Sequence, residues 1–197
     1  MNVMKNLTQI FIVFILFFIS CALPKVYFFE AKPYLVAYKE KVDKNITITF
    51  GEEIKDSFII NSAGIRKMEV FQFKKSLESS LKTTFNDSYN ALSFSDTKSN
   101  DGICLLILKI EPGWHKKSAI TTISSANGHA QSSTRYEIDS KIYYQIVVFS
   151  NGVKVKVIEK EVYSDKSTFL PKETPDLLKD GIKVMCQELY KEVISIK

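Results

Sequence analysis

The chain has 197 residues and a net charge of +5, and 45% of its residues are hydrophobic. Seven glycines and five prolines are too few for a collagen-like or disordered chain, so the composition indicates one ordinary globular domain with a real core. The basic residues are spread along the sequence without a dense Lys/Arg cluster, which argues against nucleic acid as a partner.

The N-terminal segment has the features of an export signal. Residues 10–21 read IFIVFILFFISC, an apolar run that follows Lys5 and ends at a cysteine. The run has the length of a signal-peptide core and is too short to cross a bilayer as a helix. Serine followed by Cys21 resembles the lipobox of bacterial lipoproteins. This resemblance implies that residues 1–20 are removed and that Cys21 is acylated, becomes the new N-terminus and attaches the protein to a membrane.

Other interpretations of the leader stay open. Ser20 and Ala22 form a small-x-small pair, so cleavage after Ala22 would release a soluble secreted protein. An uncleaved run would instead act as an anchor. Of these alternatives we expect the lipidated protein. Because Ala22 rather than aspartate follows Cys21, the resemblance implies delivery to the outer membrane.

The first half of the exported chain predicts two strands and a helix. Ile46, Ile48 and Phe50 alternate with threonines, which is typical of a half-buried strand that ends at Gly51. Apolar residues then recur at spacings of three and four from Val70 to Phe85, which predicts an amphipathic helix of about 18 residues. A short strand is expected at residues 91–94.

The middle of the chain predicts a central strand followed by a loop. Residues 103–110 are apolar on both faces apart from one lysine, as expected for a strand in the centre of a sheet. Residues 118–133 are rich in Ser, Thr, Ala and Gly with few large apolar residues. They have little to bury, so we expect a mobile loop or lid there.

A β-hairpin is the clearest prediction. Two alternating runs are separated by Asn151-Gly152, a pair typical of a type I′ turn because that turn needs positive φ at both central residues. Counting back from this turn places Val148 opposite Val155, and Lys154 on the other face with Lys156.

The chain ends in a second predicted helix. Thr174 is a candidate N-cap and Pro175 suits the first helical position. Apolar residues continue at helical spacing to Ile196. Gly181 costs about 1 kcal/mol relative to alanine within a helix, which indicates a tight packing contact or a slight kink.

Two cysteines remain besides Cys21. Cys104 belongs to the predicted central strand and Cys186 to the apolar stripe of the last helix. A disulfide between them is geometrically conceivable in an oxidising compartment. We expect two buried free thiols that act as small hydrophobic residues.

Charges of alternating sign occupy one face of the first hairpin strand: Arg135, Glu137, Asp139 and Lys141. Such alternation favours a solvated face with cross-strand pairs. The other interpretation is a partner-binding surface, in which Arg135, Glu137 and Lys141 act with Tyr143 and Phe149 of the same face.

Catalytic chemistry has little support in the sequence. No nucleophile motif, phosphate loop or dinucleotide fingerprint occurs, so we expect neither an enzyme nor a cofactor. One could build a site from the two histidines, His115 and His129, and Glu111. The sequence has no third ligand or nucleophile at a suitable spacing to support it. We expect solvated histidines, no metal site, and Trp114 as the anchor of the following loop.

The order of elements supports a family resemblance. A cysteine after a leader, then strand, helix, strand, Ser/Ala-rich segment, long hairpin and C-terminal helix, is similar to the small envelope lipoproteins of the YajG type. The likeness spans residues 46–196 and rests on this order with FKKSLESSLKTTF, GICLLILKI and IVVFSNGVKVKV. It implies architecture and location in the bacterial envelope, without a functional residue. Lipopolysaccharide-assembly lipoproteins have a similar arrangement.

The predicted fold is α+β, with a mostly antiparallel four- to five-stranded sheet and two amphipathic helices packed on one face. Residues 1–20 are the expected signal peptide, 21–44 a lipidated N-terminus and apolar tether, and 45–197 a single domain. The expected function is a membrane-tethered, non-catalytic binding or assembly module for an unknown envelope protein. The alternative is a lipid- or glycolipid-binding envelope protein, indicated by the apolar residues 26–29 and the mild positive charge.

The hairpin turn generates a direct test. Replacing Gly152 with valine should lower the melting temperature or shift the strand register, because a β-branched residue is strained at positive φ. Thermal unfolding followed by circular dichroism measures this, and an unchanged melting temperature would contradict the turn assignment.

Overall fold

The structure is a computed structural model that describes residues 25–27, 40–62, 65–126, 129–170 and 173–196. Ten helices and strands are found in this part of the chain. In order they are β1 (Lys25–Tyr27), β2 (Ile46–Phe50), β3 (Phe58–Ser62), β4 (Ile65–Phe71), α2 (Phe73–Phe85), β5 (Leu92–Phe94), β6 (Ile103–Ala126), β7 (His129–Ser150), β8 (Val153–Tyr163) and α3 (Thr174–Ile194).

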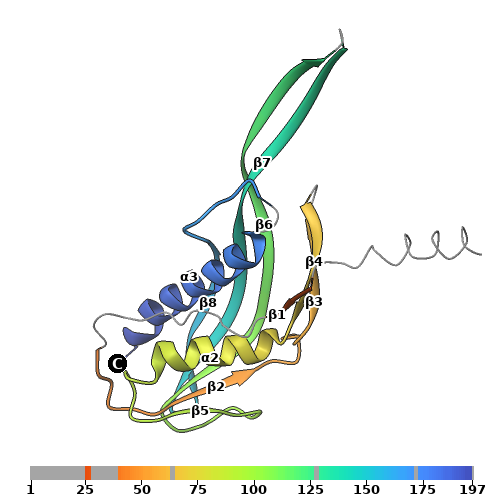
Figure 1. Cartoon of the computed structure of the whole chain (residues 1–197). Coiled ribbons are helices and arrows are strands. Elements are labelled where there is room, and N and C mark those ends of the chain that lie inside the picture. The colour runs from red at the N-terminus through yellow and green to blue at the C-terminus, as the bar shows by residue number, and fades with distance from the viewer. Residues whose placement is uncertain (1–24, 28–39, 63–64, 127–128, 171–172, 197) are drawn as a thin grey trace, which may run out of the picture.

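The main sheet has five strands in the order β5-β2-β6-β7-β8 (Figure 1). The fold is α+β as predicted, and β6 occupies the centre of this sheet. The expectation of a mostly antiparallel sheet needs correction, because β2 pairs in parallel with both β5 and β6, while β6, β7 and β8 are antiparallel. The sheet is therefore mixed. Alternation in β2 predicts a strand but carries no information about the direction of its neighbours.

A second, three-stranded sheet with the order β1-β4-β3 was not predicted. It uses part of the expected tether, because β1 pairs in parallel with β4. The predicted helix began too early: Val70 is a buried residue of β4, and the helix starts only at Phe73. Between them Gln72 has φ 55°, a left-handed conformation that ends the strand and redirects the chain.

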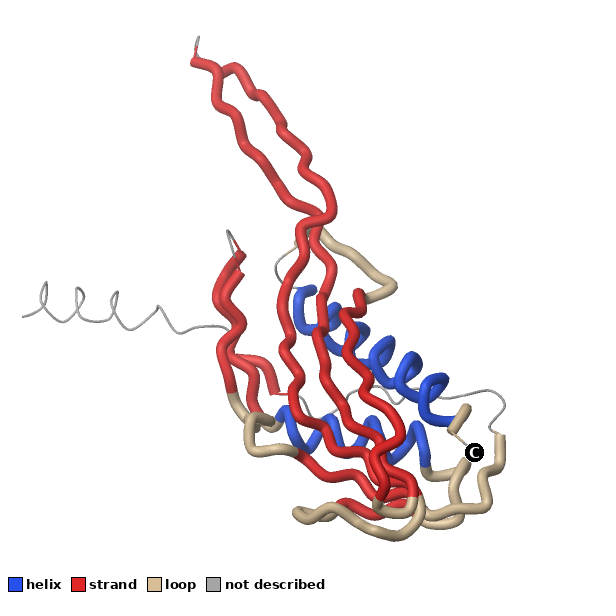
Figure 2. The backbone as a smooth tube through the Cα atoms, turned by 180° about the vertical axis from the view of Figure 1, so that it is seen from behind, coloured by secondary structure: helices blue, strands red, loops and turns tan. Residues whose placement is uncertain are grey.

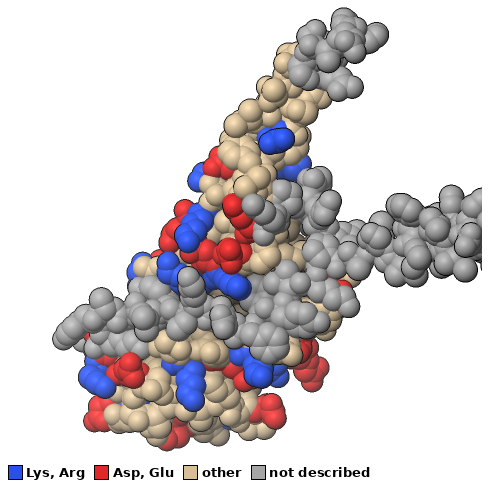
Figure 3. Space-filling model, viewed as in Figure 1, with Lys and Arg blue, Asp and Glu red and all other residues tan. Residues whose placement is uncertain are grey.

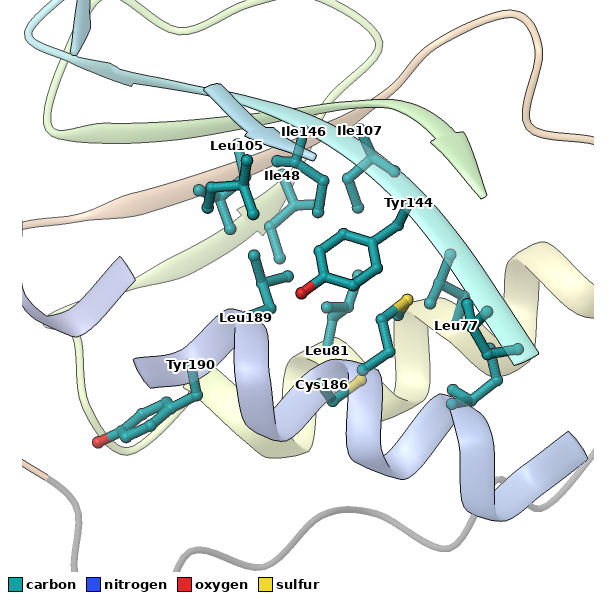
Figure 4. Close-up of a cluster of buried hydrophobic side chains, with 14 of the residues drawn as sticks. Ile48, Leu77, Leu81, Leu105, Ile107, Tyr144, Ile146, Cys186, Leu189 and Tyr190 are labelled. Carbon is teal, nitrogen blue, oxygen red and sulfur yellow. The ribbon is translucent and has the colours of Figure 1, made fainter. Parts of the chain in front are cut away.

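Both helices pack on one face of the main sheet, as predicted (Figure 1). Tyr144 projects from β7 toward α3 in the centre of this layer (Figure 4). The core around it is fully buried and draws on the sheet and both helices: Ile48, Leu77, Leu81, Leu105, Ile107, Ile146, Cys186 and Leu189. Burial of these side chains is the main stabilising contribution to the fold.

The longest feature is a two-stranded ribbon formed by the ends of β6 and β7. Pairing continues without interruption by a loop from Ile103↔Ser150 to Ala126↔His129 (Figure 2). The outer part of this ribbon projects from the body (Figures 1 and 2), and residues 115–123 are exposed. The prediction of a mobile loop at 118–133 was wrong. Thr121, Thr122 and Ile123 are β-branched residues, which favour strands. This preference and the cross-strand hydrogen bonds outweigh the shortage of buried surface.

The hairpin turn is confirmed but its register is not. Asn151 and Gly152 have φ 48° and 79°, the positive values that a type I′ turn requires. Beyond the turn, a bulge shifts β8 by one residue, so that Val148 lies opposite Lys156 instead of Val155. Lys156 consequently faces α3, where it forms an ion pair with Glu192.

The shifted register also brings Lys160 to Glu192, and this second ion pair adds a specific contact between β8 and the last helix. Val155 and Val157 are left 48% and 44% exposed on the opposite face of the sheet. The register counted from the turn had placed Val155 opposite Val148, which is buried.

The last helix begins one residue earlier than predicted. Glu173, not Thr174, is the N-cap, and it makes no side-chain capping hydrogen bond. Gly181 is confirmed as a tight packing contact against β7. A Cβ atom at Gly181 would lie 2.6 Å from Ser140 Oγ and 3.1 Å from Ile142 Cγ1, so glycine permits the close approach of helix and sheet.

This contact can be tested with a double-mutant cycle. Gly181→Ala should lower the free energy of unfolding by about 1–3 kcal/mol through overpacking, although alanine is the better helix former. Ser140 Oγ is buried without a hydrogen-bond partner in the described chain, so Ser140→Ala alone should cost little. The double variant should recover part of the loss in urea unfolding. Strictly additive effects would contradict the proposed contact.

Candidate partner-binding ribbon

The projecting ribbon carries apolar residues that no part of the described chain covers. Ile120 and Ile123 of β6 are 53% and 72% exposed. Their cross-strand partners are Arg135 and Ser132, which are also exposed. In the view of Figure 3 the visible ribbon carries few charges compared with the body. The ribbon is thus a polar, hydroxyl-rich surface interrupted by two isoleucines.

A shallow groove of about 420 Å³ lies along one face of the ribbon, near its base. Its lining comes from both ribbon strands and from the segment after β8: Ile120, Thr122, Ser133, Arg135 and Phe169. Phe169 is 37% exposed and its neighbour Leu170 is 43% exposed. The groove therefore combines an apolar wall, two hydroxyl groups and one guanidinium.

The segment that supplies Phe169 is held on the ribbon base by hydrogen bonds. Thr168 and Ile138 exchange two backbone hydrogen bonds of 2.9 Å. Glu137 accepts hydrogen bonds from Ser118 Oγ at 2.6 Å and from Ser167 Oγ. These hydroxyl groups hold the pKa of Glu137 below its ordinary value because they stabilise the carboxylate.

The residues of the predicted partner surface fall into two settings. Lys141, Tyr143 and Phe149 lie on the face of the sheet away from the helices. There Lys141 forms a 2.8 Å ion pair with Glu161, and the Tyr143 hydroxyl donates to Glu159 at 2.8 Å. Lys98 Nζ lies 4.2 Å from the centre of the Phe149 ring. These are the cross-strand and cation–π pairs of a solvated face.

Arg135 and Glu137 belong instead to the ribbon. Glu137 is engaged by two serines, whereas Arg135 has no carboxylate within ion-pair distance among the described residues. Only Arg135 of the predicted surface therefore offers an unpaired charge next to exposed apolar side chains. Whether any of the five residues contacts a partner stays a prediction.

Sequence reasoning missed Ile120 and Phe169, the apolar residues of the groove. Each is an isolated large residue in a polar stretch, a pattern with no helical or strand periodicity of its own. The run of β-branched residues after Ile120 was a usable signal for a strand. Nothing in the sequence indicated that Phe169 would lie beside it.

The outer edge of the main sheet is another exposed surface. Val153 on β8 is 67% exposed, like Val155 and Val157 beside it. The bulge near the turn and the lysines between the valines are features that discourage pairing with another chain. This edge is consequently a weaker candidate than the ribbon.

The structure describes only part of the site considered from the sequence with His115, His129 and Glu111. His115 Nδ1 lies 3.0 Å from Asp139 Oδ1, across the β6–β7 pair. Trp114 packs against the core, and the side chain of His129 lies outside the described residues. No group of three His, Cys, Asp or Glu side chains in the described chain is placed to hold a metal ion.

Cys104 and Cys186 are free and buried. Side chains alternate along β6, so Leu105 points into the core with Cys186 while Cys104 points to the opposite face. The sheet thus separates the two thiols. Burial raises the pKa of Cys186 to about 12, which disfavours the thiolate needed for reaction.

A second groove of about 510 Å³ separates β3 and the start of α2 from the middle of β6. Its apolar wall consists of Phe58, Phe73, Ile110 and Pro112. Glu53, Lys55, Lys109 and Glu111 line the rest, and the last two form a 2.8 Å ion pair. The charges balance, so this groove has no preference for one sign of ligand charge.

No protein-family model and no curated protein matches the sequence. Among solved structures, a Xanthomonas campestris protein of the DUF330 family is similar at a TM-score of 0.50 and 10% identity, covering 83% of this chain and 91% of that one. This likeness shows a shared fold.

Two further solved structures are similar at lower TM-scores. A minor lipoprotein from Acinetobacter baumannii has a TM-score of 0.45 and 12% identity, over 79% of this chain and 93% of that one. The rare lipoprotein B of Shewanella oneidensis has a TM-score of 0.42 and 14% identity, over 77% and 94%.

The leader and Cys21 lie outside the described residues. In the part of the chain that the structure describes, no helix is long and apolar enough to span a bilayer.

The Glu137 contacts predict a pH dependence at the ribbon base. The pKa of Glu137 is lower in the folded than in the unfolded protein, where it is about 4.3. The contact of Glu137 with Ser118 and Ser167 is therefore complete above the unfolded pKa, and it is lost as the pH falls through the folded pKa. Hydrogen exchange of residues 166–170, corrected for intrinsic rates, should therefore accelerate at low pH.

Glu137→Gln should raise the same exchange at neutral pH and remove the acid-dependent part. Glu159→Gln is the matched control, because Glu159 bonds Tyr143 on the outer sheet face and does not contact this segment. Equal effects of both variants would show that Glu137 does not hold the segment.

Proposed function

We propose that the protein is a lipid-anchored lipoprotein of the bacterial envelope, attached to the outer membrane through Cys21. The supporting observations are the short apolar leader, the small residue before Cys21 and Ala22 after it. The shared fold with a bacterial protein of similar length is compatible with this proposal.

The folded domain acts as a non-catalytic binding or assembly module that presents the ribbon to an envelope protein. The observation that carries this proposal is the projection of the ribbon beyond the body, with Ile120 and Ile123 exposed. An isolated two-stranded ribbon is only marginally stable in water and gains stability when a third strand or another surface covers it. Exposed apolar residues rimmed by polar ones are typical of a protein interaction site.

Site-specific photo-cross-linking in intact cells tests this function. A photoreactive amino acid at Ile123 should give a discrete cross-linked protein species, because this position would lie within the interface. The matched control is the same group at Ser79, an exposed position on α2. The intact mass of the membrane-extracted protein should show acyl chains on a chain that begins at Cys21, and Cys21→Ser should remove both the acylation and the membrane retention.

An unmodified mass or a start after Ala22 would contradict the anchor. Absence of a specific product at Ile123 would contradict the ribbon as a protein-binding element.

The second candidate function is lipid or glycolipid binding, favoured by the apolar wall of the groove beside β3 and by the net positive charge of the chain. Cross-linking of lipid to the photoreactive group at Ile123 would support this function. So would salt-sensitive binding of the Cys21→Ser protein to phosphatidylglycerol vesicles. Screening by salt weakens attraction to anionic headgroups but has little effect on docking of apolar surfaces.

A further inference from the structure

We infer that the ribbon groove with the adjoining edge of β7 is a strand-addition site for an extended peptide of a protein partner, in which an Asp or Glu adjoins an apolar residue. This inference rests on the proposed function and specifies the chemistry of the partner. It draws on three independent properties of the same surface: charge, exposed apolar area and open backbone hydrogen-bonding groups.

The charge of the groove suits a carboxylate. Arg135 is unpaired among the described residues, and the nearby Lys117 is also basic. Lys116 lies 4.2 Å from the centre of the Tyr136 ring and therefore belongs to the opposite face of the ribbon. Glu137 is the acidic residue on this face, and serine hydroxyl groups already occupy its carboxylate. A guanidinium in such a setting forms charge-assisted, often bidentate hydrogen bonds with carboxylates.

The apolar part of the groove places an aliphatic or aromatic side chain next to that carboxylate. Ile120 lies directly across from Arg135 in the ribbon, and Phe169 closes the other side. Both side chains are exposed in the described structure, and a ligand residue between them would remove both from water.

The edge of β7 supplies the backbone contacts. Ile138 and Ser140 direct their N–H and C=O groups away from β6, toward Thr168 and Ser164. In a strand every second residue has the same orientation, so Tyr136, Thr134 and Ser132 direct theirs to the same side. In the described chain no backbone group bonds them there, because the segment after Thr168 turns away at Leu170.

A peptide fits this combination better than a lipid. An added strand uses the open amides and carbonyls, whereas an acyl chain cannot. The groove is shallow and open to solvent, so it does not enclose a hydrocarbon chain. A third strand would also convert the exposed ribbon into a three-stranded sheet.

The test uses the full-length protein in detergent and a display library of random twelve-residue peptides. Selected peptides should carry Asp or Glu next to an apolar residue, and a selected peptide made synthetically is then the probe in all variants. Arg135→Gln should weaken its binding about tenfold or more, the effect of losing one charged hydrogen bond. Lys154→Gln, on the remote β8, should have no effect.

The backbone contribution needs its own pair of variants. The backbone N–H of Thr134 points away from β6, so Thr134→Pro removes a donor for the peptide without breaking a β6–β7 hydrogen bond. This change should weaken binding of the same peptide about tenfold. Thr134→Val is the matched control, because both changes remove the Thr121–Thr134 side-chain hydrogen bond but only proline removes the N–H. Equal thermal midpoints of the two variants establish that the ribbon is folded.

Absence of selected peptides, selection of peptides without an acidic residue, or unchanged binding by Arg135→Gln would overturn the inference. Competition of the probe by phosphatidylglycerol vesicles as strongly as by free peptide would assign the groove to lipid and would also overturn it. A protein cross-linked at Ile123 that still binds Arg135→Gln would leave the proposed function intact while rejecting this site.

Discussion

The antiparallel pairing of β6 with β7 is the interaction on which the rest of the structure depends. It runs from Ile103 and Ser150 in the body to Ala126 and His129 near the ribbon tip. In the body the inward side chains of these strands, including Leu105 and Tyr144, form the core with α2 and α3. Burial there stabilises the pair, and the same ladder of hydrogen bonds then continues into solvent. The ribbon exists because a buried sheet holds its base.

Three bulges lie along the β6–β7 and β7–β8 pairs, one of them between Ile107 and Lys109, and the other two determine how the exposed side chains are arranged. The bulge in β8 turns Lys156 toward α3 and leaves Val155 exposed. A second bulge lies in β6 between Lys116 and Ser118, where the ribbon leaves the body. Bulges bend a strand and increase its twist, so this position separates the core-covering sheet from the projecting ribbon.

The two exposed parts of β7, one in the body and one in the ribbon, differ in how their charges are used. On the outer sheet face Lys141 and Tyr143 already have partners on β8, and a ligand would need to replace those contacts. On the ribbon Arg135 has no such partner among the described residues, and the other side chains that line its groove are apolar or hydroxyl-bearing. A binding surface is favoured where polar groups are available and apolar area is uncovered, which distinguishes the ribbon from the sheet.

The sequence by itself determined the local elements: the alternation in β2, the Asn151-Gly152 turn, and the stripe and close-packed Gly181 of α3. Each depends on residues within a few positions of one another, so periodicity and turn chemistry suffice to predict it. Only the tertiary structure decided that β2 is parallel to β5 and β6, that β8 is shifted by one residue, and that residues 118–133 extend as strands. It also brought Phe169 beside Ile120 and Arg135. These features depend on contacts between distant segments, whose free energies are not encoded in any local pattern.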